Sequence, residues 1–198
     1  MSELLPIPEI PLSAQTPVTQ PELPALVSPP EESILTTDPH YPPPPGVRAL
    51  QVLLQHLGEA ETAPNQGPVV EWACRRWAGA EWWDAHYPRG EVPWCAGAVS
   101  SAFQDAGLPI PGSLSCDGLL RLLQRAGWLV WQPSHCERRI EAGDVVFWGP
   151  ALDLDHCDLV ETCAAQRLHV VGGNVGNAVA RRSHNLPDRR LAWVARHP

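Results

Sequence analysis

Apolar residues recur at helical spacing in the first half of this chain and in short runs in the second half. Apolar residues at every third or fourth position predict helices over 47–57, 68–77, 93–106 and 115–126. Short apolar or alternating runs predict strands over 128–131, 145–148, 156–162, 168–171 and 191–195. Residues 79–90 are rich in tryptophan and are expected to form an irregular connection. Helices followed by strands indicate an α+β domain in which N-terminal helices pack on an antiparallel sheet.

Residues 1–46 have a different composition from the rest. They hold 13 of the 23 prolines and six acidic residues, with no lysine or arginine. Such a segment buries too little apolar surface to offset the entropy lost on ordering. We therefore predict a disordered, Pro-rich acidic arm over 1–46 and one folded domain over 47–198. The arm is expected to be a spacer or a contact for a protein partner.

Charge and hydropathy exclude several classes of protein. The arm carries −6 of the formal charge of −8, so the folded part is nearly neutral and no basic field favours nucleic acid. No run reaches the ~18 apolar residues of a membrane span, and the N-terminus lacks the pattern of a secretory signal. We expect a protein that is made in the cytoplasm and either stays inside that cell or leaves it by lysis, particle delivery or specialised secretion.

Six cysteines are spread through the folded part, and we expect free thiols rather than disulfides. No Cys-x-x-Cys occurs, which argues against a structural zinc site. A second set of possible metal ligands lies close together in the sequence: Asp153, Asp155, His156, Cys157 and Asp158. Side chains alternate between the two faces of a strand, so these neighbours are poorly placed around one ion, and Asp155 and Asp158 are expected to cap the strand or face solvent. No metal or organic cofactor is predicted.

Cys95 gives the sharpest functional hypothesis. It follows Pro93 and Trp94, where a loop turns into a predicted helix, and His156 opens a predicted strand. Asn174 closes a Gly-Gly-Asn turn further along. A thiol at a helix start, an imidazole and a polar orienting residue, in that order, suggest a thiol hydrolase.

These motifs resemble the CHAP and NlpC-type cysteine peptidases, which are papain-like amidases and endopeptidases of the bacterial cell wall. The resemblance covers roughly residues 55–196 and is carried by Pro-Trp-Cys-Ala, by the run 142–148, by His156 and by Val171-Gly172-Gly173-Asn174. It implies a papain-like fold and cleavage of amide bonds in peptidoglycan. Many CHAP enzymes have a glutamate two positions before the asparagine, where this chain has Gly172.

The resemblance also implies the role of each site residue. Cys95 would attack the amide carbonyl, His156 would protonate the leaving amine and activate water, and Asn174 would orient His156. The backbone N–H of Cys95 would stabilise the oxyanion. Three tryptophans near the thiol (Trp82, Trp83 and Trp94) are candidates to stack on sugar rings, although each of them suits the core equally well.

Two other functions fit the same residues. One is a papain-like peptidase or deamidase that acts on proteins, which would use the same thiol chemistry in a different groove. The other is a catalytically inert binding or structural module, which the glycine at position 172 favours.

Overall fold

A computed structural model describes residues 42–136 and 138–198. The predicted arm, 1–46, lies outside these residues except for its last five. Two of those five belong to the first helix, which begins at Pro45 rather than at the predicted Val47. Pro45 stands in the first turn of the helix, where its missing N–H costs no hydrogen bond.

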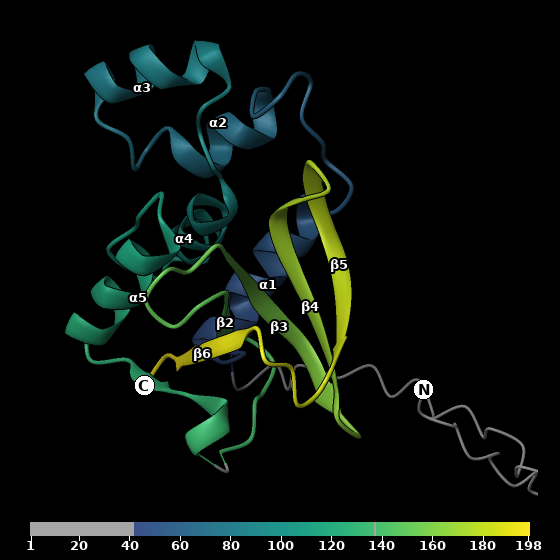
Figure 1. Ribbon diagram of the computed structural model, residues 1–198. Helices are drawn as coiled ribbons and strands as arrows, with labels where there is room; N and C mark the ends of the chain where they lie inside the picture. The colour runs from purple at the N-terminus through teal and green to yellow at the C-terminus, as the bar shows by residue number, and fades with distance from the viewer. Residues whose placement is uncertain (1–41, 137) are drawn as a thin grey trace, which may run out of the picture. The chain divides into compact units, whose positions relative to one another are not determined.

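The described chain is an α+β domain with its helices first and its strands afterwards, as predicted (Figure 1). The helices and short 3-10 turns are α1 Pro45–Gln55, α2 Pro68–Cys74, α3 Ala80–His86, η1 Tyr87–Arg89, α4 Cys95–Asp105, α5 Cys116–Arg125 and η2 Pro133–His135. The strands are β1 Leu129–Trp131, β2 Val145–Trp148, β3 His156–Ala164, β4 Arg167–Val175, β5 Ala178–Asn185 and β6 Leu191–Arg196.

All six strands form one sheet in the order β1-β6-β2-β3-β4-β5, with every neighbouring pair antiparallel. The predicted hairpin of β3 and β4 is present, with Leu159 opposite Val171. Its two-residue turn uses Ala165 and Gln166, both with positive φ, which is the geometry of a tight hairpin turn. β2 and β3 pair so that Trp148 lies opposite His156, which sets the position of the imidazole.

The helix that starts at Cys95 lies at the centre of the domain. α4 packs against β3 and β4 on one side and against α1 and α2 on others. Its first nine residues, through Phe103, are all buried, so it is apolar or small all round rather than amphipathic as predicted. A Cβ at Gly97 would lie 2.7 Å from the carbonyl oxygen of Ala73, which shows how closely α4 approaches α2.

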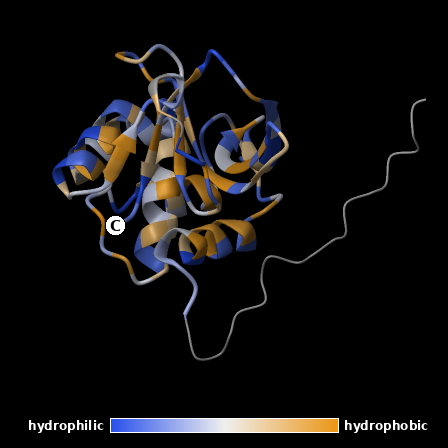
Figure 2. Ribbon diagram, turned by 90° about the horizontal axis from the view of Figure 1, so that it is seen from below, coloured by the Kyte–Doolittle hydropathy of each residue, from blue (hydrophilic) through white to orange (hydrophobic). Residues whose placement is uncertain are grey.

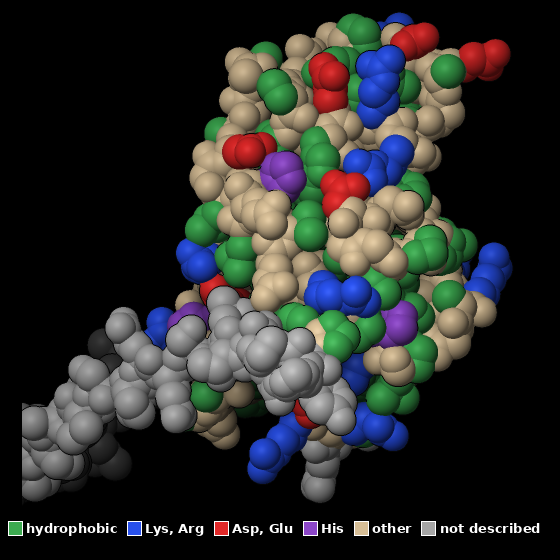
Figure 3. All heavy atoms as spheres, turned by 180° about the vertical axis from the view of Figure 1, so that it is seen from behind, with side chains coloured by type: hydrophobic (Ala, Val, Ile, Leu, Met, Phe, Trp, Pro, Cys, Tyr) green, Lys and Arg blue, Asp and Glu red, His purple; other side chains and the backbone are tan. Residues whose placement is uncertain are grey.

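The two faces of the sheet contribute to two hydrophobic clusters. Along β2, Val145 and Phe147 join the cluster beneath the helices, while Val146 and Trp148 join a second cluster on the opposite face. Figure 2 shows hydrophobic residues along the strands and along one side of the helices. On the face seen in Figure 3, acidic and arginine side chains are interspersed and do not form a field of one sign.

Two elements depart from the expectations. α3 forms within the predicted irregular connection, and β5 forms where no strand was predicted. In β5 only Val179 is well buried, because this strand lies at the edge of the sheet and carries polar and charged side chains. Within residues 42–136 and 138–198, none of the helices has the length and hydrophobicity needed to cross a bilayer.

Candidate active site

Cys95 lies at the start of α4, as the sequence predicts, although the helix begins at Cys95 itself and not at Pro93. The first N–H groups of a helix have no intrahelical acceptor, and the preceding residue, Trp94, makes no side-chain cap. The partial positive charge of this helix end favours an anion at the sulfur. Trp94 is held in place by Glu61, whose carboxylate accepts a hydrogen bond of 2.7 Å from the indole N–H.

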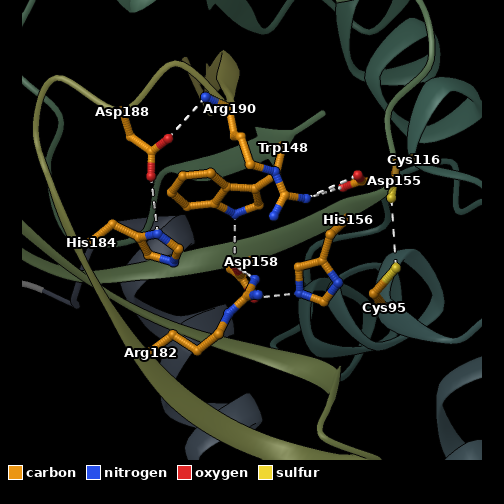
Figure 4. A network of polar contacts seen from close by, with 10 residues as sticks. All are labelled: Cys95, Cys116, Trp148, Asp155, His156, Asp158, Arg182, His184, Asp188 and Arg190. Atoms are coloured by element: carbon orange, nitrogen blue, oxygen red, sulfur yellow. Dashed lines mark hydrogen bonds and ion pairs between the residues drawn. The ribbon is translucent and has the colours of Figure 1, made fainter. Parts of the chain in front are cut away.

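His156 is the first residue of β3, and its ring is held by Asp158. The Nε2 of the ring lies 2.9 Å from Oδ1 of Asp158. Residues two apart on a strand share one face, so β3 itself places this carboxylate beside the imidazole. Figure 4 shows the ring between Asp158 and Cys95, with its second nitrogen turned toward the sulfur. This arrangement fixes the Nε2–H tautomer and leaves Nδ1 for proton transfer.

Asp158 is fully buried, yet the surrounding residues hold it as an anion. Its Oδ2 accepts hydrogen bonds of 2.7 Å from the indole N–H of Trp148 and of 2.7 Å from the guanidinium of Arg182 (Figure 4). Burial alone would raise the pKa of this carboxyl, but His156 and Arg182 lower the pKa below its usual value. The sequence expectation that Asp158 caps the strand or faces solvent is therefore wrong.

The sulfur and the imidazole shift each other's pKa in the directions that favour an ion pair. Burial works against the charged ring, but hydrogen bonds to Asp158 and Cys95 raise the pKa of His156 to about 9. Hydrogen bonds from Cys116 and Cys157, and then from His156, lower the pKa of the Cys95 thiol well below its usual value although burial opposes this. Together these shifts favour a thiolate–imidazolium pair at neutral pH.

Two further thiols face Cys95. Cys116, the first residue of α5, places its sulfur 3.6 Å from that of Cys95 (Figure 4). Cys157 points from β3 toward the same place, and the three sulfurs lie within 4.8 Å of one another. A hydrogen bond with Cys157 lowers the pKa of Cys116, but hydrogen bonding to Cys95 and burial outweigh it and raise this pKa overall. Burial raises the pKa of Cys157 well above its usual value, so both thiols are neutral donors to the Cys95 sulfur.

Asn174 does not hold the position that the sequence suggested. It lies at an irregularity between β4 and β5, where the register shifts between Gly172 and Val175. Its φ of 60° is left-handed, a conformation that asparagine adopts more readily than most residues. The hydrogen-bond partner of His156 is Asp158, so the geometry assigns the orienting role to Asp158 instead.

Gly172 on β4 leaves the space that the carboxylate of Asp158, from β3, occupies beside His156. A Cβ at position 172 would overlap Oδ1 of Asp158 and would lie 3.3 Å from Nε2 of His156. The space that a side chain on β4 would fill, such as the glutamate found there in many CHAP enzymes, is thus occupied by Asp158. The glycine at this position is therefore compatible with an intact site, and it is not by itself a sign of an inert one.

The three candidate stacking residues differ in their exposure. Trp94 is fully buried beneath the start of α4, so it has no free face for a sugar and its predicted substrate contact is wrong. Trp83 is buried and stacks on Tyr87, with ring centroids 4.3 Å apart, so it belongs to the core as well. Trp82 is 36% exposed and stacks on His86, and it alone of the three remains a candidate for substrate contact.

Within the described part of the chain, the acids near His156 do not form a group with the spacing of metal ligands. Asp155 pairs with Arg190 and Asp158 pairs with His156 and Arg182. The group of described residues with the spacing of metal ligands is Cys95, Cys116 and Cys157, from three different elements. Distances along the sequence gave no sign of this convergence, because the three cysteines are 21 and 41 residues apart.

Comparison with known proteins gives limited further information. No family model and no curated protein matches the chain. Among solved structures, Ly7917 matches with 16% identity and a TM-score of 0.43, covering 77% of this chain and 62% of that chain. A second structure, of Ly7917 with the hydrolysis product of MDP, matches with 17% identity and a TM-score of 0.38, covering 52% of this chain and 53% of that one. The chain thus spans less than two thirds of Ly7917, and likeness at this level does not assign a substrate.

Proposed function

We propose that this protein is a cysteine hydrolase that cleaves amide bonds of peptidoglycan. Cys95 is the nucleophile, His156 is the general acid and base, and Asp158 positions His156. The observation that carries the proposal is the order sulfur, imidazole, carboxylate across α4 and β3, with a lowered thiol pKa and a raised imidazole pKa. These are the groups and the charge states that thiol-dependent amide cleavage needs.

In the acylation step, the Cys95 thiolate attacks the carbonyl carbon of the scissile amide. The negative charge that forms on the carbonyl oxygen is stabilised by the backbone N–H of Cys95 at the start of α4. The imidazolium of His156 donates its Nδ1 proton to the departing amine, which leaves a thioester on Cys95. Asp158 keeps its hydrogen bond to Nε2 throughout, so the ring does not rotate.

In the deacylation step, the neutral Nδ1 of His156 takes a proton from water, and the resulting hydroxide attacks the thioester. The acid is released and the thiolate–imidazolium pair returns. Cys116 and Cys157, as neutral donors beside the sulfur, favour its anionic form before attack and as the leaving group. No metal or organic cofactor is part of this mechanism.

The substrate class depends on the motif resemblance to CHAP and NlpC-type enzymes. Pro-Trp-Cys-Ala at the start of α4, the run 142–148 around β2 and His156 at the start of β3 occupy adjacent positions in the fold. Exposed Trp82 offers an aromatic face of the kind that sugar rings stack on. The bond that is cut lies within the peptide part or between peptide and sugar.

The test is digestion of defined peptidoglycan fragments by the full chain, followed by mass spectrometry of the products. We expect wild type and Cys163→Ser, a control on β3 outside the site, to release the same fragments. Cys95→Ser and His156→Ala should lose at least about 10³-fold in rate while remaining folded. Near-wild-type cleavage by Cys95→Ser would contradict the mechanism, and cleavage of an unfolded protein substrate alone would favour the peptidase or deamidase.

One observation favours the inert module. Cys95 is only 5% exposed and the side chain of His156 is 13% exposed, so both groups are largely shielded from solvent. A hydrolase requires that the substrate carbonyl reach this sulfur. A Cys95 that resists alkylation in the native protein but reacts after unfolding would support an inert module with the same fold.

A further inference from the structure

Three sulfurs from separate elements meet at the proposed nucleophile. Cys95 begins α4, Cys116 begins α5 and Cys157 lies on β3, and their sulfurs lie within 4.8 Å of one another. All three residues are buried, and the Cys95 and Cys116 sulfurs are 3.6 Å apart. The amide hydrolysis described above needs only one of these thiols.

The spacing matches that of ligands around one tetrahedral ion. Zinc–sulfur bonds of about 2.3 Å at tetrahedral angles place neighbouring sulfurs about 3.8 Å apart. The distance of 3.6 Å between the Cys95 and Cys116 sulfurs is close to that value. The other two sulfur–sulfur distances are at most 4.8 Å, so small rotamer changes would bring all three sulfurs to ligand spacing. Thiolates are soft ligands that favour zinc over magnesium or calcium.

His156 lies beside Cys95 but outside the group of atoms that are within 4.8 Å of one another, so its ring has to move toward the sulfurs to supply a fourth ligand. Its Nε2 is engaged by Asp158, so Nδ1 is the nitrogen that faces Cys95 (Figure 4). A ligand imidazole whose other nitrogen donates to a carboxylate is the usual second-shell arrangement at zinc sites, because the carboxylate fixes the tautomer and increases the basicity of the ring. Asp158 has that role here and is itself held by Trp148 and Arg182.

We propose that Cys95, Cys116, Cys157 and His156 form a Cys₃His site that binds Zn²⁺, a divalent ion that prefers thiolate ligands. The ion binds through the three Sγ atoms, which already lie at ligand spacing, and Nδ1 of His156 joins them when the ring moves toward the ion. The thiols and the imidazolium give up their protons to solvent on binding, and no oxidation or reduction takes place. One doubly charged cation with three thiolates leaves a net charge of −1, and the helix starts at Cys95 and Cys116 lie beside it.

A metal in this position would regulate the hydrolase. This consequence, unlike metal binding itself, depends on the proposed function. The ion takes both the lone pair of the nucleophile and Nδ1 of the general base, so the metal-bound protein is inactive. Removal of the ion by a chelator restores the pair, and the enzyme is thus switched by the supply of the metal.

The experiment measures metal binding directly on the reduced, metal-free full chain. Zn²⁺ affinity is obtained by competition with a chromophoric chelator, and Co²⁺ serves as a spectroscopic probe of the ligands. We expect one ion per chain, sulfur-to-cobalt charge-transfer bands and the visible bands of a tetrahedral site. Cys116→Ser and Cys157→Ser should each weaken Zn²⁺ binding at least about 10-fold. Cys163→Ser, which changes a β3 cysteine outside the cluster, should bind as wild type does.

The outcomes separate this proposal from the hydrolase proposal. Zn²⁺ that binds Cys116→Ser as tightly as wild type, or a Co²⁺ spectrum without charge-transfer bands, would overturn the site even in an active enzyme. A disulfide formed by dissolved oxygen, seen as a loss of two hydrogens in the mass of the protein measured without reductant, would also overturn it, because inhibition would then come from oxidation of the thiols and not from the ion. Tight binding by a protein without any hydrolase activity would leave the site in place and remove its regulatory role. Circular dichroism of the two serine variants shows whether each one is folded.

Discussion

At the residue scale, the site depends on how one imidazole is shared between two anions. Asp158 binds Nε2 of His156 and the Cys95 sulfur lies toward Nδ1, so the ring is cationic when both partners are charged. The cation in turn lowers the pKa of the thiol. Loss of either partner therefore lowers the pKa of His156.

This coupling predicts the pH dependence of activity. The pKa of His156 is raised to about 9, so the imidazolium persists at neutral pH and is lost as pH rises through that value. The kcat/KM of wild type should therefore fall on the alkaline side near pH 9. Asp158→Asn removes the anion beside the ring and so lowers the pKa of His156. The alkaline fall in kcat/KM should then move to lower pH, and activity should be roughly 10²–10⁴-fold lower.

The control for this prediction is the fold of the variant. Asparagine keeps an acceptor for Trp148, and Arg182 is partly exposed and can turn to solvent, so the free energy of unfolding should fall by at most about 3 kcal/mol. Denaturant unfolding checks this value. An alkaline limb that stays near pH 9 in a folded Asp158→Asn variant would show that Asp158 does not set the charge of the ring.

The Asp158 interaction shows what the sequence can predict at this scale. Side chains alternate along a strand, so residues 156 and 158 lie on one face, and the sequence His156-Cys157-Asp158 is enough to predict that the carboxylate lies beside the imidazole. We instead assigned the orienting role to Asn174, from the order of motifs in the resembling family. No local pattern marks the convergence of Cys116 and Cys157, because it depends on how α5 and β3 each pack against α4.

At the element scale, β4 leaves the space in which the carboxylate lies. Gly172→Ala would push a methyl group into Oδ1 of Asp158 and crowd Nε2 of His156. Because a displacement of about 1 Å at a catalytic group costs on the order of 10² in rate, we predict that loss or more. The matched control is Gly79→Ala, where a Cβ meets nothing within 4 Å and φ is −65°.

The measurement for the glycine pair is kcat/KM with a thermal unfolding curve for each variant. Gly79→Ala should match wild type in both. A Gly172→Ala enzyme with full activity would mean that the position of Asp158 against β4 has no catalytic importance.

The helices and strands show which elements sequence patterns reveal. Long apolar patterns correctly predicted the helix at Cys95 and the β3–β4 hairpin. β5 was missed because its polar alternation, with Arg181 and Arg182, carries little apolar signal at a sheet edge. α3 was missed because a seven-residue helix with clustered tryptophans lacks a clear period.

At the scale of the whole molecule, the first helix is part of the packed core of the described residues. α1 packs on α4, β3 and β4, so the domain needs its first helix from Pro45 onward. Gly46 lies so close to the backbone of Gly143 that no side chain would fit there. The boundary that we predicted from composition, after residue 46, therefore falls inside α1.

Two truncations test this boundary. Deletion of residues 1–41 should leave the thermal midpoint within about 2 °C of the full chain and leave activity on soluble fragments unchanged. Deletion of 1–46 should lower the midpoint, because it removes the start of α1 and the hydrogen bond of 3.0 Å from Arg48 N–H to the Pro44 carbonyl. Equal midpoints for the two truncations would show that the start of α1 adds nothing to stability.

The pH dependence of thiol alkylation tests the central claim most directly. The native, metal-free protein is treated with iodoacetamide between pH 5 and 10, and the modification of each cysteine peptide is followed by mass spectrometry. Cys95 should react at neutral pH and faster than Cys163, which serves as an internal reference because its pKa is raised by partial burial. A Cys95 that stays unmodified until the alkaline range, in parallel with Cys163, would contradict the thiolate–imidazolium pair.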